Sequence, residues 1–289
     1  MQVIQRIAMH ALILSVLGTG IGVSVPAFAS VVKPEALLNV VNKNTQNVSY
    51  SQVTILQNES ISYAGQVINV RTEQSFQTER LGSNTMVSGK VTISQLGHAL
   101  QELLFINHNY LYIKIGKSPW QLFGTINKNK LTQLVQTNQY IYQKVTVKSQ
   151  KFGDVFHATL SPKTFSSIVT QGLTIYKASP GVAIAPNMNR ILAIMFQHVN
   201  ATMMVTAKKV LGKERVTNEK VTMNLSVTKY DMQRIKELVD SSQKTVTSSV
   251  YGQPRNLIPS GAMKITLNET VKYTYQKKPI QIPKGIPGN

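Results

Sequence analysis

The chain has 289 residues, of which 31 are Lys or Arg and 12 are Asp or Glu, giving a formal net charge of +19, and it contains no cysteine. Without cysteine the protein forms no disulfide and no thiolate metal site, and catalysis by a cysteine nucleophile is excluded. A hydrophobic fraction of 42% is large enough to build a folded core.

The first 29 residues have the pattern of a secretory signal peptide. Arg6 supplies a positive charge, the stretch from Ile7 to Val25 carries no formal charge, and Pro26 is followed by the small-x-small motif Ala27-Phe28-Ala29. An uncleaved membrane anchor is the alternative, because the stretch is just long enough to span a bilayer. We expect cleavage before Ser30 and a secreted protein of the cell envelope or exterior. With no cysteine after the leader, anchoring as a bacterial lipoprotein is not expected.

The excess of lysine and arginine has two interpretations. A cationic exported protein is attracted to anionic cell-wall polymers or to a membrane surface. The scarcity of carboxylates also suits an acidic exterior, in which carboxylates would be protonated. Nucleic acid is not expected as a partner, because the lysines are scattered along the sequence instead of being grouped into stripes.

Residues 30–289 are expected to form a single domain in which strands with period two alternate with helices. Helices are predicted over residues 34–43, 127–138, 188–199 and 231–240, and a short one begins at Ser161-Pro162. Strands are predicted over residues 47–57, 67–78, 85–94, 102–115 (turning at 107–109), 140–160 (turning at 152–154), 202–211, 216–227 and 263–275. Gly89 is interpreted as a possible bulge, and the tail after Pro283 is expected to be frayed.

The order of these elements favours an α+β fold built on a large antiparallel sheet. Strands follow strands, with a few helices between them, whereas a parallel sheet would need a helix between successive strands. The sequence therefore predicts no dinucleotide-binding fold, and no Gly-x-Gly-x-x-Gly or phosphate loop occurs in it.

Groups of residues that could perform catalysis are missing from the sequence. The four histidines after the leader lack the spacing of metal ligands, and no Gly-x-Ser-x-Gly elbow is present. Glu73 and Glu79 share one face of a predicted strand, but six residues of strand separate them by about 20 Å, too far for an acid/base pair. We expect no catalytic residues, no metal and no cofactor.

Apolar side chains suited to a ligand cavity are plentiful. Methionines gather in the second half of the chain, and methionine adapts to ligands of varied shape. Ordinary core packing is the alternative for each of these side chains, including the tyrosine and the tryptophan that are candidates for a cavity mouth. The candidate ligand-binding residues are Leu104, Tyr112, Trp120, Leu134, Ile191, Met195, Phe196, Met204 and Met223.

Three stretches of the sequence resemble the LolA/LolB and LppX/LprG group of lipoprotein and lipid carriers. Residues 36–41 followed by 53–55 are similar to the opening helix and strand, residues 109–114 and Trp120 to a tyrosine-rich strand, and residues 273–283 to the closing strand. The resemblance implies a large curved antiparallel sheet, an unclosed half-barrel with helices covering its concave face. It also implies an apolar cavity for acyl chains between sheet and helices. Many relatives carry a lipid-attached cysteine, which this chain lacks.

These observations together predict a secreted, non-catalytic binding protein that holds a lipid or another apolar small molecule between sheet and helices. Lysines at the rim of the cavity would hold an anionic head group. The alternative is a cationic, cell-wall-associated structural or adhesive protein that binds anionic polymers through its charge.

Overall fold

A computed structural model describes residues 33–63, 65–81, 84–107, 110–125, 142–151, 153–165, 187–243, 261–276 and 278–287. The predicted leader and the predicted helix over residues 127–138 lie outside this part of the chain. Within the described ranges, no helix has both the length and the apolar character needed to cross a membrane.

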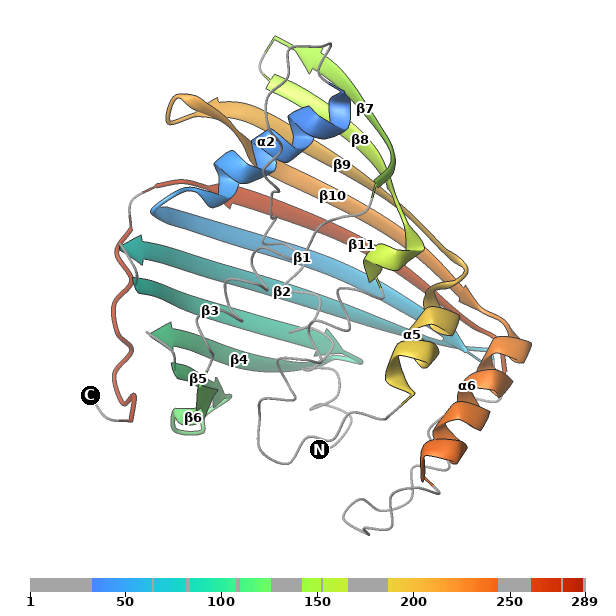
Figure 1. Ribbon diagram of the computed structural model, residues 1–289. Helices are drawn as coiled ribbons and strands as arrows, with labels where there is room; N and C mark the ends of the chain where they lie inside the picture. The colour runs from blue at the N-terminus through green and yellow to red at the C-terminus, as the bar shows by residue number, and fades with distance from the viewer. Residues whose placement is uncertain are drawn as a thin grey trace.

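Eleven strands form one open antiparallel sheet in the order β6-β5-β4-β3-β2-β1-β11-β10-β9-β8-β7 (Figure 1). The first strand pairs with the last, and each half of the chain then adds strands outward to an edge, which confirms the predicted α+β class. The strands are β1 (Tyr50–Tyr63), β2 (Gln66–Leu81), β3 (Asn84–Gln95), β4 (His98–Asn107), β5 (Tyr110–Ile115), β6 (Gln121–Thr125), β7 (Tyr142–Gln150), β8 (Gly153–Leu160), β9 (Val199–Val210), β10 (Lys213–Val227) and β11 (Met263–Thr274).

Helices cover the concave face of this half-barrel. Figure 1 shows α2 (Pro34–Gln46) lying across the sheet, and it packs against β10 and β7. Two more helices, α5 (Met188–Phe196) and α6 (Lys229–Gln243), lie side by side near one end of the strands. The helix predicted over residues 188–199 ends at Phe196, because Val199 already belongs to β9.

Strand residues alternate between the buried concave face and the exposed convex face. Along β10, from Glu219 to Val227, every second residue is buried and every residue between is exposed. The threonines and valines of this strand suit a pleated, half-buried surface. The concave face therefore carries the main core, to which α2 adds Leu38 and Val41 and α6 adds Met232 and Ile235.

A bulge in β10 anchors the C-terminal end of α2. The pairing of β10 with β9 shifts between Val216 and Asn218. At this point the Val216 backbone N–H donates to Thr45 Oγ1 at 2.8 Å, and Arg215 Nε donates to the Asn44 carbonyl at 3.0 Å. The helix is thus tied to the sheet by two hydrogen bonds, the first of them buried, as well as by apolar packing.

A second apolar cluster forms where the C-terminal segment packs against strands β4 and β5 (Figure 1). Phe105, Trp120, Ile280 and Ile286 are its buried members. The Ile280 backbone N–H donates to Oε2 of Glu79 at 2.7 Å, which fixes the segment to β2. The expected fraying after Pro283 is therefore wrong as far as residue 287, because burial of Ile286 holds the tail.

The predicted bulge at Gly89 is also wrong. Strands β2 and β3 pair from Val70–Gln95 to Leu81–Asn84 with no shift of register, and Gly89 stands directly opposite Phe76.

Candidate ligand-binding face

Four polar side chains lie close together in the middle of the apolar concave face. They are Gln74 of β2, Gln57 of β1, Glu269 of β11 and Glu219 of β10, and each has an exposed fraction of 4% or less. These four strands are consecutive in the sheet. We call this set the polar row.

The register of the sheet brings the polar row together. Gln57 pairs directly with Glu269, whereas Gln74 and Glu219 lie in the next row of residues, in line with Ile55. Paired residues on one face of an antiparallel sheet have Cβ atoms about 5 Å apart, and diagonal neighbours lie about 7–8 Å apart. Gln57 and Glu269 are therefore close enough to act on one small chemical group, each with its diagonal neighbour beside it, whereas Gln74 and Glu219 at the two ends of the row are three strand spacings, or about 14 Å, apart.

Several terminal atoms of the polar row have no hydrogen-bond partner among the described residues. These atoms are Oε1 of Gln57, both terminal atoms of Gln74, and Oε2 of Glu219 and of Glu269. A buried polar atom without a partner costs about 1–3 kcal/mol. The unpaired atoms therefore lower the stability of the folded protein unless another molecule supplies their hydrogen-bond partners. Buried polar atoms that lack partners are for this reason typical of a binding site.

Both carboxyl groups in the polar row take up protons more readily than usual. Burial raises the pKa of Glu269 to about 8. Burial, together with the nearby charge of Glu269, raises the pKa of Glu219 to about 8, although a hydrogen bond with Tyr273 opposes the rise. At neutral pH the polar row is then mostly uncharged, and it offers O–H and N–H donors as well as carbonyl acceptors.

Several of the candidate apolar residues lie on the concave face that carries the polar row, or pack against its core. Ile191 and Met223 belong to the concave core, and Met195 and Phe196 pack against it. Leu104 points to the same face as Phe76, since both are in register with Gly89, and it is partly buried. The second half of the chain thus contributes most of the apolar surroundings.

The other candidates do not join this cluster. Met204 is in register with His157 and Lys220 on the convex face, whereas its neighbour Met203 is buried in the core. Tyr112 and Trp120 belong to the cluster at the C-terminal segment. Leu134 lies outside the described residues.

The polar row was not among the sequence-based candidates, although the sequence contains a signal for it. Each of its members occupies an inward position of an alternating strand, and next to the two glutamates the inward positions are mostly apolar. In β10 this pattern is Glu219 before Val221 and Met223, and in β11 it is Glu269 between Leu267 and Val271. A charged residue at an inward position of such a strand indicates a buried functional or structural group.

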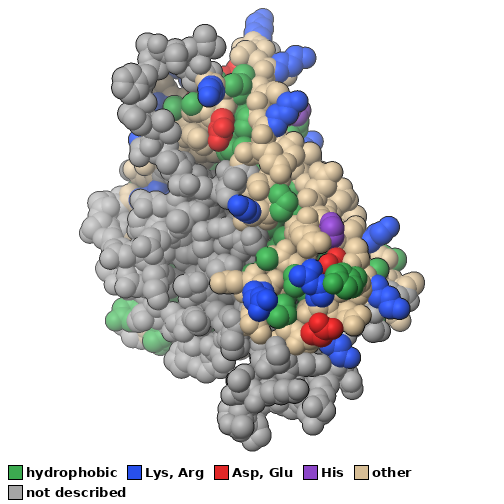
Figure 2. All heavy atoms as spheres, turned by 45° about the vertical axis from the view of Figure 1, so that its right-hand side comes forward, with side chains coloured by type: hydrophobic (Ala, Val, Ile, Leu, Met, Phe, Trp, Pro, Cys, Tyr) green, Lys and Arg blue, Asp and Glu red, His purple; other side chains and the backbone are tan. Residues whose placement is uncertain are grey.

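The side of the molecule that carries α5 and α6 has charged side chains and a hollow of its own. Figure 2 shows Lys and Arg side chains spread over its described part, and a hollow of about 420 Å³ lies between the two helices beside Arg190 and Arg234. Asp231 is hydrogen-bonded to Thr228 at the start of α6, which lowers the pKa of the carboxyl. Within the described residues, no group of His, Asp and Glu has the arrangement of a metal site.

No protein-family model and no curated protein matches the sequence. Among solved structures, the chain is similar to the crystal structure of a DUF1329 family protein from Desulfovibrio piger ATCC 29098. The two share 8% identity over 80% of this chain and 86% of that chain, with a TM-score of 0.24. At this TM-score the similarity supports no functional conclusion, so the function has to follow from the residues of the chain itself.

Proposed function

We propose that the protein is a secreted, non-catalytic binding protein that holds a lipid-like ligand against the concave face of its sheet. The observation that supports this proposal is the polar row. Its buried terminal atoms lack partners in the described chain, and the surrounding face is apolar. A ligand with an apolar body and one polar group would complement both features.

The chemistry of the polar row favours an uncharged polar group on the ligand. A carboxylate or phosphate placed there would face two carboxyl groups, whereas a hydroxyl or a secondary amide can both donate to and accept from the side-chain amide of Gln57 and the protonated carboxyl of Glu269. The apolar body would contribute roughly 25 cal/mol for each Å² removed from water, before the cost of ordering. Lysines at a rim would then have no role in holding the buried group, in contrast to the expectation from the sequence.

The architecture agrees with this proposal. An unclosed half-barrel with helices over its concave face is the fold implied by the resemblance to LolA/LolB and LppX/LprG carriers, in which acyl chains lie between sheet and helices. Export depends on the leader formed by residues 1–29, and release from the membrane depends on the lack of a cysteine after it.

Binding is tested with two fluorescent probes of equal chain length, a fatty alcohol and a fatty acid, added at pH 6 to protein purified without detergent. We expect saturable binding of the alcohol and weaker binding of the acid. Replacing Gln57 with Leu removes one partner of the polar group and should weaken alcohol binding about 5- to 10-fold. The matched control is Asn58→Leu, which changes the adjacent amide on the convex face and should leave binding unchanged.

Native mass spectrometry of the same preparations provides a second measurement. A mass increase that disappears on treatment with organic solvent is expected for protein that has retained its ligand. Lack of binding of either probe, together with ligand-free mass spectra, would rule out the proposal. Equal losses in Gln57→Leu and Asn58→Leu would show that the probe does not bind at the polar row.

A further inference from the structure

From β9 to β3 the convex face of the sheet is mainly polar, with Met204 and Leu56 as partly buried exceptions, whereas over β4 and β5 it carries the apolar cluster of the C-terminal segment. Its middle strands present hydroxyl and amide side chains in register, one strand after another. One such row across β9, β10, β11, β1, β2 and β3 consists of Thr202, Thr222, Asn268, Asn58, Arg71 and Ser94. The rows on either side of it contain further Thr, Ser and Asn residues, so the pattern continues along the strands.

This face also has a strong excess of positive charge. Exposed lysines project from it on four strands, namely Lys90, Lys144, Lys148, Lys220, Lys264 and Lys272. Among the described strand residues of the convex face, the carboxylates are Glu73, which pairs with Arg71 at 2.7 Å, and Glu79, which is buried under the C-terminal segment. The carboxyl groups of Glu219 and Glu269 belong to the opposite face.

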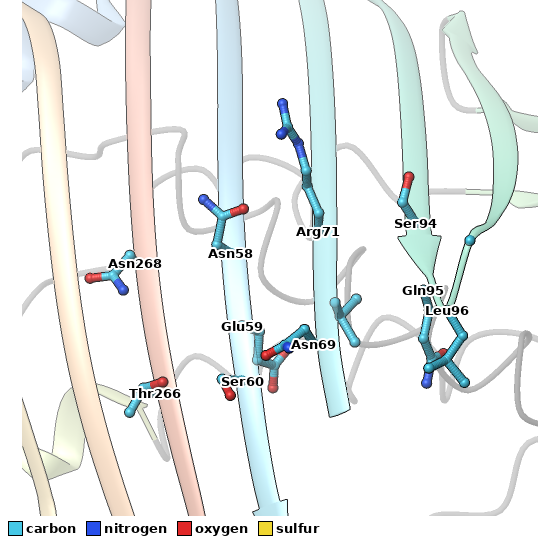
Figure 3. Close-up of a pocket in the computed structure, with 12 residues that line it drawn as sticks. Asn58, Glu59, Ser60, Asn69, Arg71, Ser94, Gln95, Leu96, Thr266 and Asn268 are labelled. Atoms are coloured by element: carbon cyan, nitrogen blue, oxygen red, sulfur yellow. The ribbon is translucent and has the colours of Figure 1, made fainter. Parts of the chain in front are cut away.

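A shallow hollow lies in the polar surface (Figure 3). It has a volume of about 400 Å³ and is lined mainly by amide and hydroxyl groups from β11, β1, β2 and β3. Asn58 and Asn268 stand side by side in it, and the guanidinium group of Arg71 projects beside them. The hollow can therefore receive a group that forms many hydrogen bonds.

We infer that the convex face binds an acidic polysaccharide lying across the strands. The lysines can form ion pairs with the anionic groups of the polymer, and the Thr, Ser and Asn side chains between them can form hydrogen bonds with sugar hydroxyls. Lys272 and Lys90 lie in one row, three strand spacings or about 14 Å apart, with hydroxyl side chains between them. A polymer with repeated charges can reach both lysines at once.

An anionic membrane is a poorer match for this face. Membrane surfaces are held by basic residues together with apolar side chains that enter the head-group region. The exposed large apolar side chains of the described chain lie in turns, on helices, in the C-terminal segment or near the ends and edges of the sheet, and none lies in the middle rows of the convex face. Because this face is opposite the polar row, the inference is independent of the proposed function.

The test measures binding to polygalacturonate, with dextran as the neutral polymer of similar length. Wild-type protein should bind polygalacturonate and not dextran, and binding should weaken as salt is added. Replacing Lys90, Lys220 and Lys272 with Gln should weaken binding about tenfold or more. The control replaces Lys43, Lys229 and Lys236, three exposed lysines of the helices α2 and α6, with Gln, which removes the same charge away from this face and should change binding less than about threefold.

Three results would overturn the inference. Equal losses in the two triple variants would mean that net charge alone is responsible. Equal binding of dextran and polygalacturonate would remove the role of the lysines. Tight binding to phosphatidylglycerol vesicles without binding to polygalacturonate would identify a membrane as the partner. Circular dichroism of both triple variants verifies that the sheet is intact.

Discussion

The ring of Phe76 occupies the space that a side chain at Gly89 would need. A Cβ atom on Gly89 would lie 2.5 Å from Cδ1 and 2.6 Å from Cε1 of Phe76. The two residues face each other across β2 and β3, and Phe76 belongs to the concave core. The glycine thus lets an aromatic side chain lie flat over the neighbouring strand, as in other sheets in which an aromatic residue covers a glycine.

Replacing Gly89 with Ala should destabilise the protein by about 1–3 kcal/mol, because the methyl group forces the buried ring out of position. Urea unfolding measures the change in the free energy of unfolding. Ser88→Ala, one residue away on the convex face, is the control and should have little effect. The double change Phe76→Leu with Gly89→Ala should cost less than the sum of the two single changes, and simple additivity would contradict the contact.

Stability should fall as the pH rises from about 5 to 8. The pKa values of Glu219 and Glu269 are about 8 in the folded protein, against 4.5 for a free side chain. Between these values the folded state holds more protons than the unfolded state, so their contribution is fully present below pH 4.5 and is lost as the pH approaches 8. The slope is up to about 1.4 kcal/mol per pH unit for each carboxyl. Urea midpoints at several pH values measure it.

The variant with Glu219→Gln and Glu269→Gln provides the control for this pH dependence. Neutral amides of the same size cannot lose the proton, so the decline between pH 5 and 8 should flatten, and at pH 8 the variant should be more stable than the wild-type protein. Replacing the exposed Glu237 of α6 with Gln should leave the slope as it is. An unchanged slope in the double variant would show that the two carboxyls are ionised in the folded state.

The only tryptophan reports on the docking of the C-terminal segment. Trp120 packs with Ile280 and Ile286. Ile286→Ala should destabilise the protein by about 2–5 kcal/mol, shift the fluorescence of Trp120 to longer wavelength and expose it to iodide quenching. The control is Ile282→Ala, because Ile282 lies in the same segment but is exposed. Identical spectra for the wild-type protein and Ile286→Ala would mean that the tail is not docked in solution.

One hydroxyl group makes part of the attachment of α2 to the sheet. Thr45 Oγ1 accepts from the Val216 backbone N–H and donates to the Val41 carbonyl at 2.9 Å. Thr45→Val keeps the shape but leaves the buried N–H without its partner, which should cost about 1–3 kcal/mol. Thr45→Ser keeps the hydroxyl and should retain most of the stability. Both are measured by thermal unfolding, and equal losses would point to packing of the methyl group instead.

Much of the local structure could be predicted from the sequence, because period two and helical spacing are local properties. The strand and helix order, and with it the α+β class, follow from such patterns. Alternation along β10 also shows that Glu219 shares a face with Val221. What alternation within one strand cannot show is which strand lies beside it.

Predicting the candidate site requires knowing which strands are neighbours in the sheet. Glu219 and Glu269 are 50 residues apart in the chain and become neighbours only through the register of β10 with β11, and Gln57 joins them because the first strand pairs with the last. Met204 was the sequence-based candidate of β9, yet it lies on the convex face and the core contains its neighbour Met203 instead. Composition alone determined a cationic chain without cysteine. Long-range strand pairing decided where its carboxyl groups and its lysines lie, because register depends on contacts between distant segments and on which face is buried.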